Sequence, residues 1–293
     1  MTAKVFDGKK EAEKVIDSIA TDAKALKKKL GRSPKLVVVR MTQDPAADIF
    51  VSEKRKAAER LGIVLSEVLV KPEEKAVLNT FSSLNQAETV DGYYVQLPVP
   101  GFKPEWWEKI DIRKDIEGLG ADAMERLAGG TKLVIPPTPM AVLHALGVAL
   151  NISPDKLDLS DKNTVLISRS RLIGIPLLHL LTQKKAKVIV CHKETKDISK
   201  LTKNADILIT GTGQPGLITG EMVKNGVIAI DLGTKIISQN GQNKVFGDLD
   251  YSGVASKARF ITPPVGGVGP LVVAYLLKNL LTLITLAEDT KGN

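Results

Sequence analysis

The strongest constraint on the fold is a unit of about 30 residues that opens with a short apolar run at 164–167. This run breaks at the polar turn 168–170, the residues 174–186 have the apolar spacing of a helix, and a second apolar run follows at 187–191. A strand, a loop, a helix and a strand in this order build parallel sheets and bind dinucleotides. The turn lacks the usual G-x-G-x-x-G pattern, because Gly174 is its only glycine. An ordinary crossover without a ligand is therefore an open alternative.

The segments around this unit alternate between helical and strand-like patterns. Apolar residues recur at helical spacing in 8–31, 46–62 and 72–88, and strand-like runs at 34–42, 63–70 and 91–100 lie between and after them. This alternation predicts a parallel sheet that is covered on both faces. After residue 191, three more strand-like runs each precede a glycine- or proline-rich loop, which is where α/β sheets bind their ligands.

Two features divide the chain into domains. A cluster of three prolines at 136–139 opens a helical segment, which is typical of a boundary between domains. The last segment, from Gly269 to about Ala287, is apolar around most of its circumference and is expected to be a buried helix. We predict an α/β fold of two α/β domains that flank a cleft, the second a Rossmann-like dinucleotide-binding domain, with the C-terminal helix returning to the first. The predicted domains are a catalytic domain at 1–140, with 269–293 packed back on it, and an NAD(P)-binding domain at 141–268.

The composition excludes several classes of function. Among 293 residues, 41 Lys and Arg outnumber 33 Asp and Glu, for a formal net charge of +8. The cations are scattered and aromatic residues make up only 4%, which argues against a nucleic-acid surface built on base stacking. Cys191 is the only cysteine and there are three histidines, so we expect neither an intrachain disulfide nor a metal site. With no apolar run near about 18 residues and no apolar signal core, we expect a cytoplasmic protein without a membrane partner.

Four polar residues of the first half are candidates for chemistry. Lys54 lies four residues after Phe50 on a predicted helix, where a desolvated lysine can act as a base, although a solvated basic helix has the same spacing. Gln96 ends a strand just before two prolines and either orients a lysine or is a polar strand end. Asp115 and Glu117 alternate in a loop, and they either bind an amide-and-amine edge such as that of a pterin or form a charged surface turn.

Two loops of the second half are candidates for binding. The segment 263–270 has three glycines and three prolines in eight residues, which indicates positive dihedral angles or a close approach of a ligand, or else a stiff connector. Arg169, Ser170 and Lys193 flank the two strand ends of the dinucleotide unit. A cation after the second strand, where NAD enzymes have an acid, favours a phosphorylated ribose, although exposed loop cations are the alternative.

Taken together and in this order, these pieces resemble the bifunctional methylenetetrahydrofolate dehydrogenase/cyclohydrolase family. The resemblance extends from about Ala3 to Leu281. Its pieces are FVSEKRKAAERLGI, DGYYVQLPVP, KDIEGLG, PPTP, SRSRLIGIP, VIVCHKET, ADILITGTGQPGLI, VIAIDLGTK, GDLD and ITPPVGGVGPLVVAYLLKNLL. The resemblance implies oxidation of methylene-tetrahydrofolate with NADP rather than NAD, followed by hydrolysis of the methenyl product to formyl-tetrahydrofolate in the same cleft. It also implies one-carbon metabolism, no metal, and a homodimer formed through the cofactor domain.

The resemblance assigns roles to individual residues. The catalytic set is Lys54, Gln96 as the residue that orients it, Phe50 in place of the family's tyrosine, and Asp115. The folate-binding set is Phe50, Val95, Gln96, Leu97, Pro98, Glu117, Gly266, Gly267 and Pro270. The set that holds NADP is Ser168, Arg169, Ser170, Ile173, Gly174, His192, Lys193, Thr195, Gly211, Thr212, Gly213, Leu232 and Gly233.

Several positions depart from the family's pattern. Phe50 keeps the ring of the usual tyrosine but lacks its phenolic donor, and Glu117 is one methylene longer than the usual aspartate. The others are Ala47 for serine, Pro137 for cysteine, Met140 for glycine, Ser168 for glycine, and Pro264-Val265 in place of Val-Pro. We hypothesise that Phe50 impairs the hydrolysis more than the oxidation. A dehydrogenase with weak hydrolysis, a catalytically silent paralogue that binds folate or a partner, and an unrelated nicotinamide dehydrogenase are the alternatives.

Overall fold

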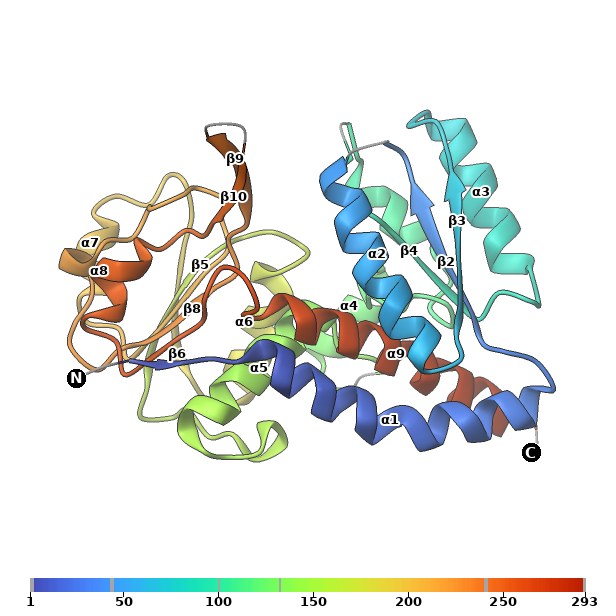
Figure 1. The fold of residues 1–293 in the computed structure, drawn as a ribbon, viewed down its shortest axis with the longest axis horizontal. Coiled ribbons are helices and arrows are strands. Elements are labelled where there is room, and N and C mark those ends of the chain that lie inside the picture. The colour runs from blue at the N-terminus through green and yellow to red at the C-terminus, as the bar shows by residue number, and fades with distance from the viewer. Residues whose placement is uncertain (1–2, 43–44, 100, 132, 240–241, 292–293) are drawn as a thin grey trace. The chain divides into compact units, whose positions relative to one another are not determined.

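The computed structural model describes residues 3–42, 45–99, 101–131, 133–239 and 242–291, and its helices and strands are labelled in Figure 1. The chain divides into two compact units. We call Met1–Glu11 with Thr138–Val272 the Rossmann unit, and Ala12–Pro137 with Val273–Asn293 the Lys54 unit. Helices α1 and α9 begin in the Rossmann unit and continue in the Lys54 unit. Their bounds are Gly8–Leu30 for α1 and Gly269–Lys291 for α9.

The Lys54 unit contains a parallel three-stranded sheet in the order β3-β2-β4. Its elements are β2 (Lys35–Arg40), α2 (Pro45–Arg60), β3 (Val64–Leu69), α3 (Glu74–Gln86), β4 (Gly92–Val95), a 3-10 helix (Pro104–Lys109) and α4 (Ala121–Ala128). The four inner residues of β2 and all of β4 are buried, so the sheet is covered on both faces. The predicted alternation of helices and strands is confirmed.

Helix α9 supports the loops of the Lys54 unit. The Asn279 side chain donates from Nδ2 to the backbone oxygens of Ile116 (2.9 Å) and Ile135 (2.8 Å). A Cβ built on Gly92 of β4 would lie 2.8 Å from the Leu280 side chain, so α9 packs closely under this strand. The predicted return of the C-terminal helix to the first domain is confirmed. By length and composition α9 could also cross a membrane, but 56% of that span is buried within the chain, and the core helix of a soluble protein passes the same test.

The Rossmann unit contains a parallel six-stranded sheet in the order β1-β11-β8-β7-β5-β6. Its elements are β1 (Lys4–Val5), α5 (Pro137–Leu150), a 3-10 helix (Pro154–Lys156), β5 (Asn163–Ile167), α6 (Gly174–Gln183), β6 (Lys187–Cys191), α7 (Ile198–Thr202), β7 (Ile207–Thr210), a 3-10 helix (Gly220–Met222), β8 (Ile228–Asp231), β9 (Lys235–Gln239), β10 (Gln242–Phe246), α8 (Tyr251–Ala255) and β11 (Phe260–Ile261). The chain moves from β5 to β6 on one side and then returns to β7 on the other. The carboxyl end of β5 is therefore the point where strand order reverses, and open sheets bind ligands at this point.

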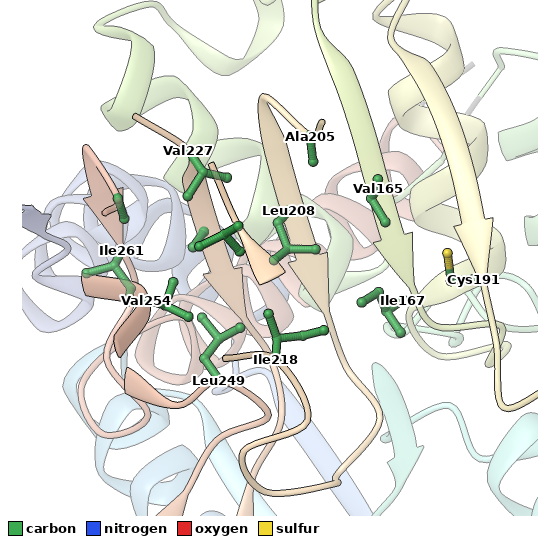
Figure 2. Packing of buried hydrophobic residues seen from close by; sticks show 13 residues of the cluster. Val165, Ile167, Cys191, Ala205, Leu208, Ile218, Val227, Leu249, Val254 and Ile261 are labelled. Carbon is green, nitrogen blue, oxygen red and sulfur yellow. The ribbon is translucent and has the colours of Figure 1, made fainter. Parts of the chain in front are cut away.

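One face of this sheet forms a continuous apolar core. Val165 of β5 lies opposite Leu208 of β7, which lies opposite Ala229 of β8. Figure 2 shows these strands with Val254 of α8 and Ile218 packed among their side chains. Residues at alternate positions of a strand share a face, so this packing fixes which strand residues point away from the core.

Several elements differ from the expectations drawn from sequence. The predicted first domain starts at residue 1, whereas β1 pairs with β11 in the Rossmann unit, because the short apolar segment supplies an edge strand there. Helix α5 begins at Pro137, within the proline cluster, since proline is compatible with the first turn of a helix. The antiparallel pair β9–β10, the short helices α4, α7 and α8 and the 3-10 helices were not predicted; most have six or fewer residues, too few to show a period.

Candidate functional site

The amide of Gln96 fixes the position of Lys54. Lys54 lies on α2, and Gln96, which is 8% exposed, directly follows β4. Lys54 Nζ donates to Gln96 Oε1 at 2.8 Å, while Gln96 Nε2 donates to the backbone oxygen of Leu97 at 2.7 Å. The second hydrogen bond sets the orientation of the amide, so its carbonyl oxygen is the atom that faces the lysine. Both the ammonium and the amine form of Lys54 can donate this bond, so Gln96 positions the nitrogen in either form, and the ammonium donates the stronger bond.

Two opposing effects act on the charge of Lys54. Burial lowers the pKa of Lys54, and the carboxylate of Glu117 acts in the opposite direction. Burial likewise raises the pKa of Glu117, and the positive charge of Lys54 opposes this. Removing a charge from water is costly, so each group is more easily neutral here than on the surface. An amine that exchanges its proton near neutral pH is suited to general acid–base chemistry.

The ring of Tyr94 lies beneath Lys54, and sequence reasoning missed it. Lys54 Nζ lies 4.2 Å from the centroid of the Tyr94 ring. Tyr94 is 1% exposed, and its hydroxyl makes no hydrogen bond within the residues that the structure describes. The signal was present in the sequence, because Tyr94 stands two residues before Gln96 at the end of a strand, and side chains at this spacing share a face.

Asp115 shapes the loop that carries Glu117. It is 1% exposed, and its two oxygens accept hydrogen bonds from the backbone N–H groups of Gly118 (2.9 Å) and Gly120 (2.7 Å). Burial raises the pKa of Asp115 to about 6, and the backbone donors oppose this shift. Gly118 has a φ of +62°, a conformation that favours glycine. These contacts give Asp115 a structural reason to be present, and its assignment as a catalytic residue stays a prediction.

The remaining predicted folate-binding residues of the Lys54 unit differ in exposure. Phe50, on the same helix as Lys54, is 45% exposed, which leaves its ring free to pack against a flat ligand. Val95 is 2% exposed, so its side chain belongs to the core and only its backbone is available to a ligand. Leu97 is half-buried and Pro98 is exposed, and the peptide bond between them is cis. The residues available to a ligand on this unit are therefore Phe50, Lys54 and the segment 96–98.

The predicted cofactor residues lie at one edge of the Rossmann unit's sheet. They follow the carboxyl ends of strands β5, β6, β7 and β8, and these ends meet at the same edge because the strands are parallel. The four groups are 168–174 after β5, 192–195 after β6, 211–213 after β7 and 232–233 after β8. In addition, the ten-residue helix α6 has its N-terminus at this edge, and helix N-termini bind phosphate groups favourably.

The turn after β5 explains why a single glycine is sufficient there. A Cβ built on Gly174 would lie 2.3 Å from the backbone oxygen of Ser168, so any side chain would collide with the strand end. The Ser170 hydroxyl accepts a hydrogen bond from the backbone N–H of Ile173 at 3.1 Å, which holds the turn in shape. Gly174 therefore serves the close packing of helix on strand, and a serine performs the turn-forming role of the missing glycines.

Two cations at this edge are available for an anionic group. Arg169 and Lys193 are exposed and make no polar side-chain contact with any residue that the structure describes. Glu194 follows Lys193 in the sequence, and its carboxylate is 4.0 Å from Nδ1 of His192. The free cations and the tight glycine turn fit a phosphorylated dinucleotide. In the described ranges, no group of three or more His, Cys, Asp or Glu residues is arranged for a metal ion.

Two buried aspartates tie the loops of this edge together, and the sequence analysis did not single them out. Asp248 is fully buried and accepts hydrogen bonds from the Thr210 hydroxyl (2.7 Å) and the backbone N–H groups of Thr212 (2.6 Å) and Gln214 (2.9 Å). Asp231, at the end of β8, accepts three backbone N–H groups. Its donors are Gly233 (2.8 Å), Asp248 (3.1 Å) and Leu249 (3.0 Å). Burial raises the pKa of Asp231 to about 6.

This aspartate pair gives Gly233 a second reason to be glycine. A Cβ built on Gly233 would lie 2.2 Å from Asp248 Oδ1, and a Cβ built on Gly247 would lie 2.0 Å from Asp231 Oδ2. Both glycines are therefore required by packing against a carboxylate, whether or not a cofactor also contacts them. The sequence carries a signal for the pair, since each aspartate has a glycine within two positions in DLGTK and GDLD.

The glycine-rich loop at 263–270 has the positive dihedral angle that its sequence predicts, and the backbone of Gly8 approaches it closely. Gly266 has a φ of +75°, and its backbone oxygen accepts a hydrogen bond from the N–H of Gly8 at 2.9 Å. A Cβ built on Gly8 would lie 1.6 Å from the oxygen of Gly267, so Gly8 supports this loop from the start of α1. Gly8 was not a predicted residue. Gly266, Gly267 and Pro270 belong to the Rossmann unit, and Lys54 and Gln96 belong to the Lys54 unit.

Comparison with known proteins identifies the family. Residues 6–117 match the family described as tetrahydrofolate dehydrogenase/cyclohydrolase, catalytic domain, and residues 136–288 match the NAD(P)-binding domain of the same family. The bifunctional protein FolD of Nautilia profundicola is 38% identical over 279 residues, which cover 94% of this chain and 95% of that protein.

Solved structures agree with this result. The bifunctional enzyme FolD from Campylobacter jejuni, a methylenetetrahydrofolate dehydrogenase/cyclohydrolase, is 32% identical with a TM-score of 0.87 and covers 97% of this chain and 99% of that one. The methylenetetrahydrofolate dehydrogenase-cyclohydrolase of Trypanosoma brucei, in complex with NADP and an inhibitor, is 29% identical with a TM-score of 0.90 and covers 98% and 99%. The resemblance drawn from the sequence and the predicted fold class are confirmed. This chain belongs to the tetrahydrofolate dehydrogenase/cyclohydrolase family.

Proposed function

We propose that this protein oxidises methylene-tetrahydrofolate to methenyl-tetrahydrofolate and then hydrolyses the methenyl compound to formyl-tetrahydrofolate, as part of one-carbon metabolism. The observation that carries the proposal is the hydrogen bond between Lys54 and Gln96, at the end of a strand, with the lysine's pKa lowered by burial. Membership of the family supplies the pair of reactions. The geometry supplies a group that can move protons in the second of them.

The second reaction needs three proton movements. When water adds to the methenyl carbon it must lose a proton, and when the carbon–nitrogen bond of the adduct breaks, the nitrogen must gain one. The hydroxyl of the adduct then loses its proton to solvent as it becomes the formyl carbonyl. In our proposal the amine of Lys54 accepts the first proton and the resulting ammonium donates it to the leaving nitrogen. Gln96 holds the lysine nitrogen in place through both steps, because its carbonyl oxygen accepts a hydrogen bond from either form.

The first reaction depends mainly on positioning. Bound NADP supplies the acceptor for the hydride that leaves the methylene carbon. In our proposal Arg169 and Lys193 hold the phosphates of NADP, and the residues after β5, β6, β7 and β8 line its site. Phe50 and the segment 96–98 contact the folate, together with Glu117, Gly266, Gly267 and Pro270. Placing two bound molecules side by side can contribute several kcal/mol to catalysis without any proton transfer.

A coupled assay tests this function. The purified protein is mixed with NADP and methylene-tetrahydrofolate, and the methenyl compound is followed by its absorbance. We expect the methenyl compound to form and then to decay faster than in a control without protein. If it never forms with NADP, and NAD does not replace NADP, the proposed function is wrong, and the alternative of a silent paralogue that binds folate is favoured instead.

A substitution at Phe50 is expected to affect the two reactions unequally. A phenol at this position would add one hydrogen-bond donor to a half-exposed ring beside Lys54, and a hydrogen bond to a reacting group contributes about 1–3 kcal/mol. We expect Phe50→Tyr to raise the rate of hydrolysis by about ten- to a hundredfold and to change the rate of oxidation much less. Both rates are measured in the same assay, by supplying either methylene- or methenyl-tetrahydrofolate. Ile49→Tyr, on the neighbouring exposed residue of the same helix (59% exposed), is the control. An unchanged rate of hydrolysis would refute the role of Phe50.

The wild-type rates decide between the two enzymatic alternatives. If methenyl-tetrahydrofolate accumulates in the coupled assay, the protein is a dehydrogenase with a weak second activity. The retained contact of Lys54 with Gln96 favours the bifunctional enzyme. A homodimer formed through the cofactor domain and a cytoplasmic location stay predictions from the sequence.

A further inference from the structure

The feature that the proposed chemistry leaves unexplained is the aromatic residue beneath the lysine. Tyr94 is on β4 and Lys54 is on α2, and the lysine nitrogen lies 4.2 Å from the centroid of the ring. An ammonium group within about 6 Å of the face of an aromatic ring is attracted by the electron-rich π face of the neutral ring, most strongly where water is excluded. Tyr94 is 1% exposed and Lys54 is half-buried, so water has little access to the contact.

The phenol of Tyr94 is not the part that acts. Its hydroxyl makes no hydrogen bond within the described part of the chain. Burial raises the pKa of Tyr94 well above its usual value, with Glu117 and Glu67 adding to the shift and Arg40 and Arg55 opposing it. The ring is therefore neutral over the working range of pH. What it presents to Lys54 is a neutral aromatic face.

We propose that Tyr94 is a positioning residue for the catalytic lysine, and that the face of its ring stabilises the ammonium form of Lys54 between the two proton transfers. The other groups acting on Lys54 are the carboxylate of Glu117 and the carbonyl oxygen of Gln96, and both also favour the ammonium. Burial favours the amine. The ring thus offsets part of the effect of burial on the pKa of Lys54. Both the ammonium and the amine form are then populated in the same range of pH.

The inference rests on the proposed function for its catalytic meaning, but it can be tested without activity. The Lys54 side chain is titrated by heteronuclear NMR in the unliganded protein labelled with ¹³C-lysine, with its signal assigned by its loss in Lys54→Met. Removing the ring face should lower the lysine's pKa. The strength of a buried cation–π contact corresponds to about one pKa unit, or a tenfold change in the ratio of ammonium to amine.

Three variants separate the ring face from the hydroxyl and from packing. Tyr94→Phe keeps the face and removes only the unpartnered hydroxyl, so Lys54 should titrate as in the wild type. Tyr94→Leu removes the face, and Lys54 should titrate about one unit lower. Because Leu could leave a void that prevents folding, pentafluorophenylalanine is also placed at position 94. It keeps the shape of the ring and reverses the charge of its face, so the same downward shift is expected.

Kinetics provide the second measurement. The amine of Lys54 is present above its pKa, so the rate of hydrolysis should rise with pH through that value. In the leucine and fluorinated variants, the rise of the hydrolysis rate should move to lower pH by as much as the pKa of Lys54 falls. In Tyr94→Phe the rise should occur at the same pH as in the wild type. If Lys54 of the fluorinated variant titrates at the wild-type pH, the inference is overturned. If the NMR shift is found but the wild type hydrolyses nothing, the ring effect holds and the proposed function fails.

Discussion

Replacing Lys54 by methionine is expected to lower the rate of methenyl-tetrahydrofolate hydrolysis by about 10²–10⁴, the usual contribution of a general acid–base group. Methionine has nearly the length of lysine and fills the space above the Tyr94 ring, so the change removes the exchangeable proton rather than the packing. The oxidation of methylene-tetrahydrofolate should fall less, because it depends on the placement of two molecules. The measurement is the rate of each reaction, supplied with its own substrate.

The matched control for this variant is on the same helix. Lys56 also carries a positive charge on α2, but it is 68% exposed and pairs with Glu53 across one turn. Lys56→Met should leave both rates close to the wild type, since exposed ion pairs contribute little. If Lys54→Met retains hydrolysis within threefold of the wild type while its fold is intact, Lys54 is not the acid–base group, and the proposed role of the Lys54–Gln96 contact is wrong.

The sequence was sufficient to predict the parts of this fold that have a clear period. Helices α1, α2 and α3 are amphipathic over three or more turns, and the strands that follow them, β2, β3 and β4, are apolar runs bounded by turn residues. These helices and strands were therefore predictable. The strand β1 was not, because Lys4–Val5 is too short to have a period and is a strand only by pairing with β11. Short elements depend on partners that are distant in the sequence, and no local pattern records these partners.

The same distinction applies to the candidate site. Lys54 and Gln96 were predictable because each lies in a motif, and their contact brings residues 42 positions apart within 2.8 Å. Tyr94 was missed because an aromatic residue on a buried strand is most often part of the core. Asp248 was missed because its three donors, Thr210, Thr212 and Gln214, are more than 30 positions away. A carboxylate that organises a distant loop leaves no local spacing to recognise.

Asp248 is the residue on which the predicted cofactor loop most depends. Its Oδ2 atom accepts hydrogen bonds from the Thr210 hydroxyl and the Thr212 N–H, and its Oδ1 atom accepts one from the Gln214 N–H. An asparagine amide has one oxygen and one NH₂ group, so in either orientation a donor of the loop faces a donor of the amide. Each buried donor left without an acceptor costs about 1–3 kcal/mol.

We therefore expect Asp248→Asn to lower the free energy of unfolding by about 1–3 kcal/mol for each lost hydrogen bond and to raise the KM for NADP at least tenfold. The KM for methylene-tetrahydrofolate should change much less, because the displaced loop contains 211–213, which are predicted to contact the cofactor and not the folate. A general loss of structure would instead raise both KM values or lower the fraction of active protein. Urea unfolding and the two KM values are measured on the same preparation.

Asp250→Asn is the control, since Asp250 is exposed and its carboxylate accepts a hydrogen bond only from the nearby Ser252 hydroxyl among the described residues. Equal increases in the two KM values would show that Asp248 stabilises the unit as a whole and does not position the cofactor loop.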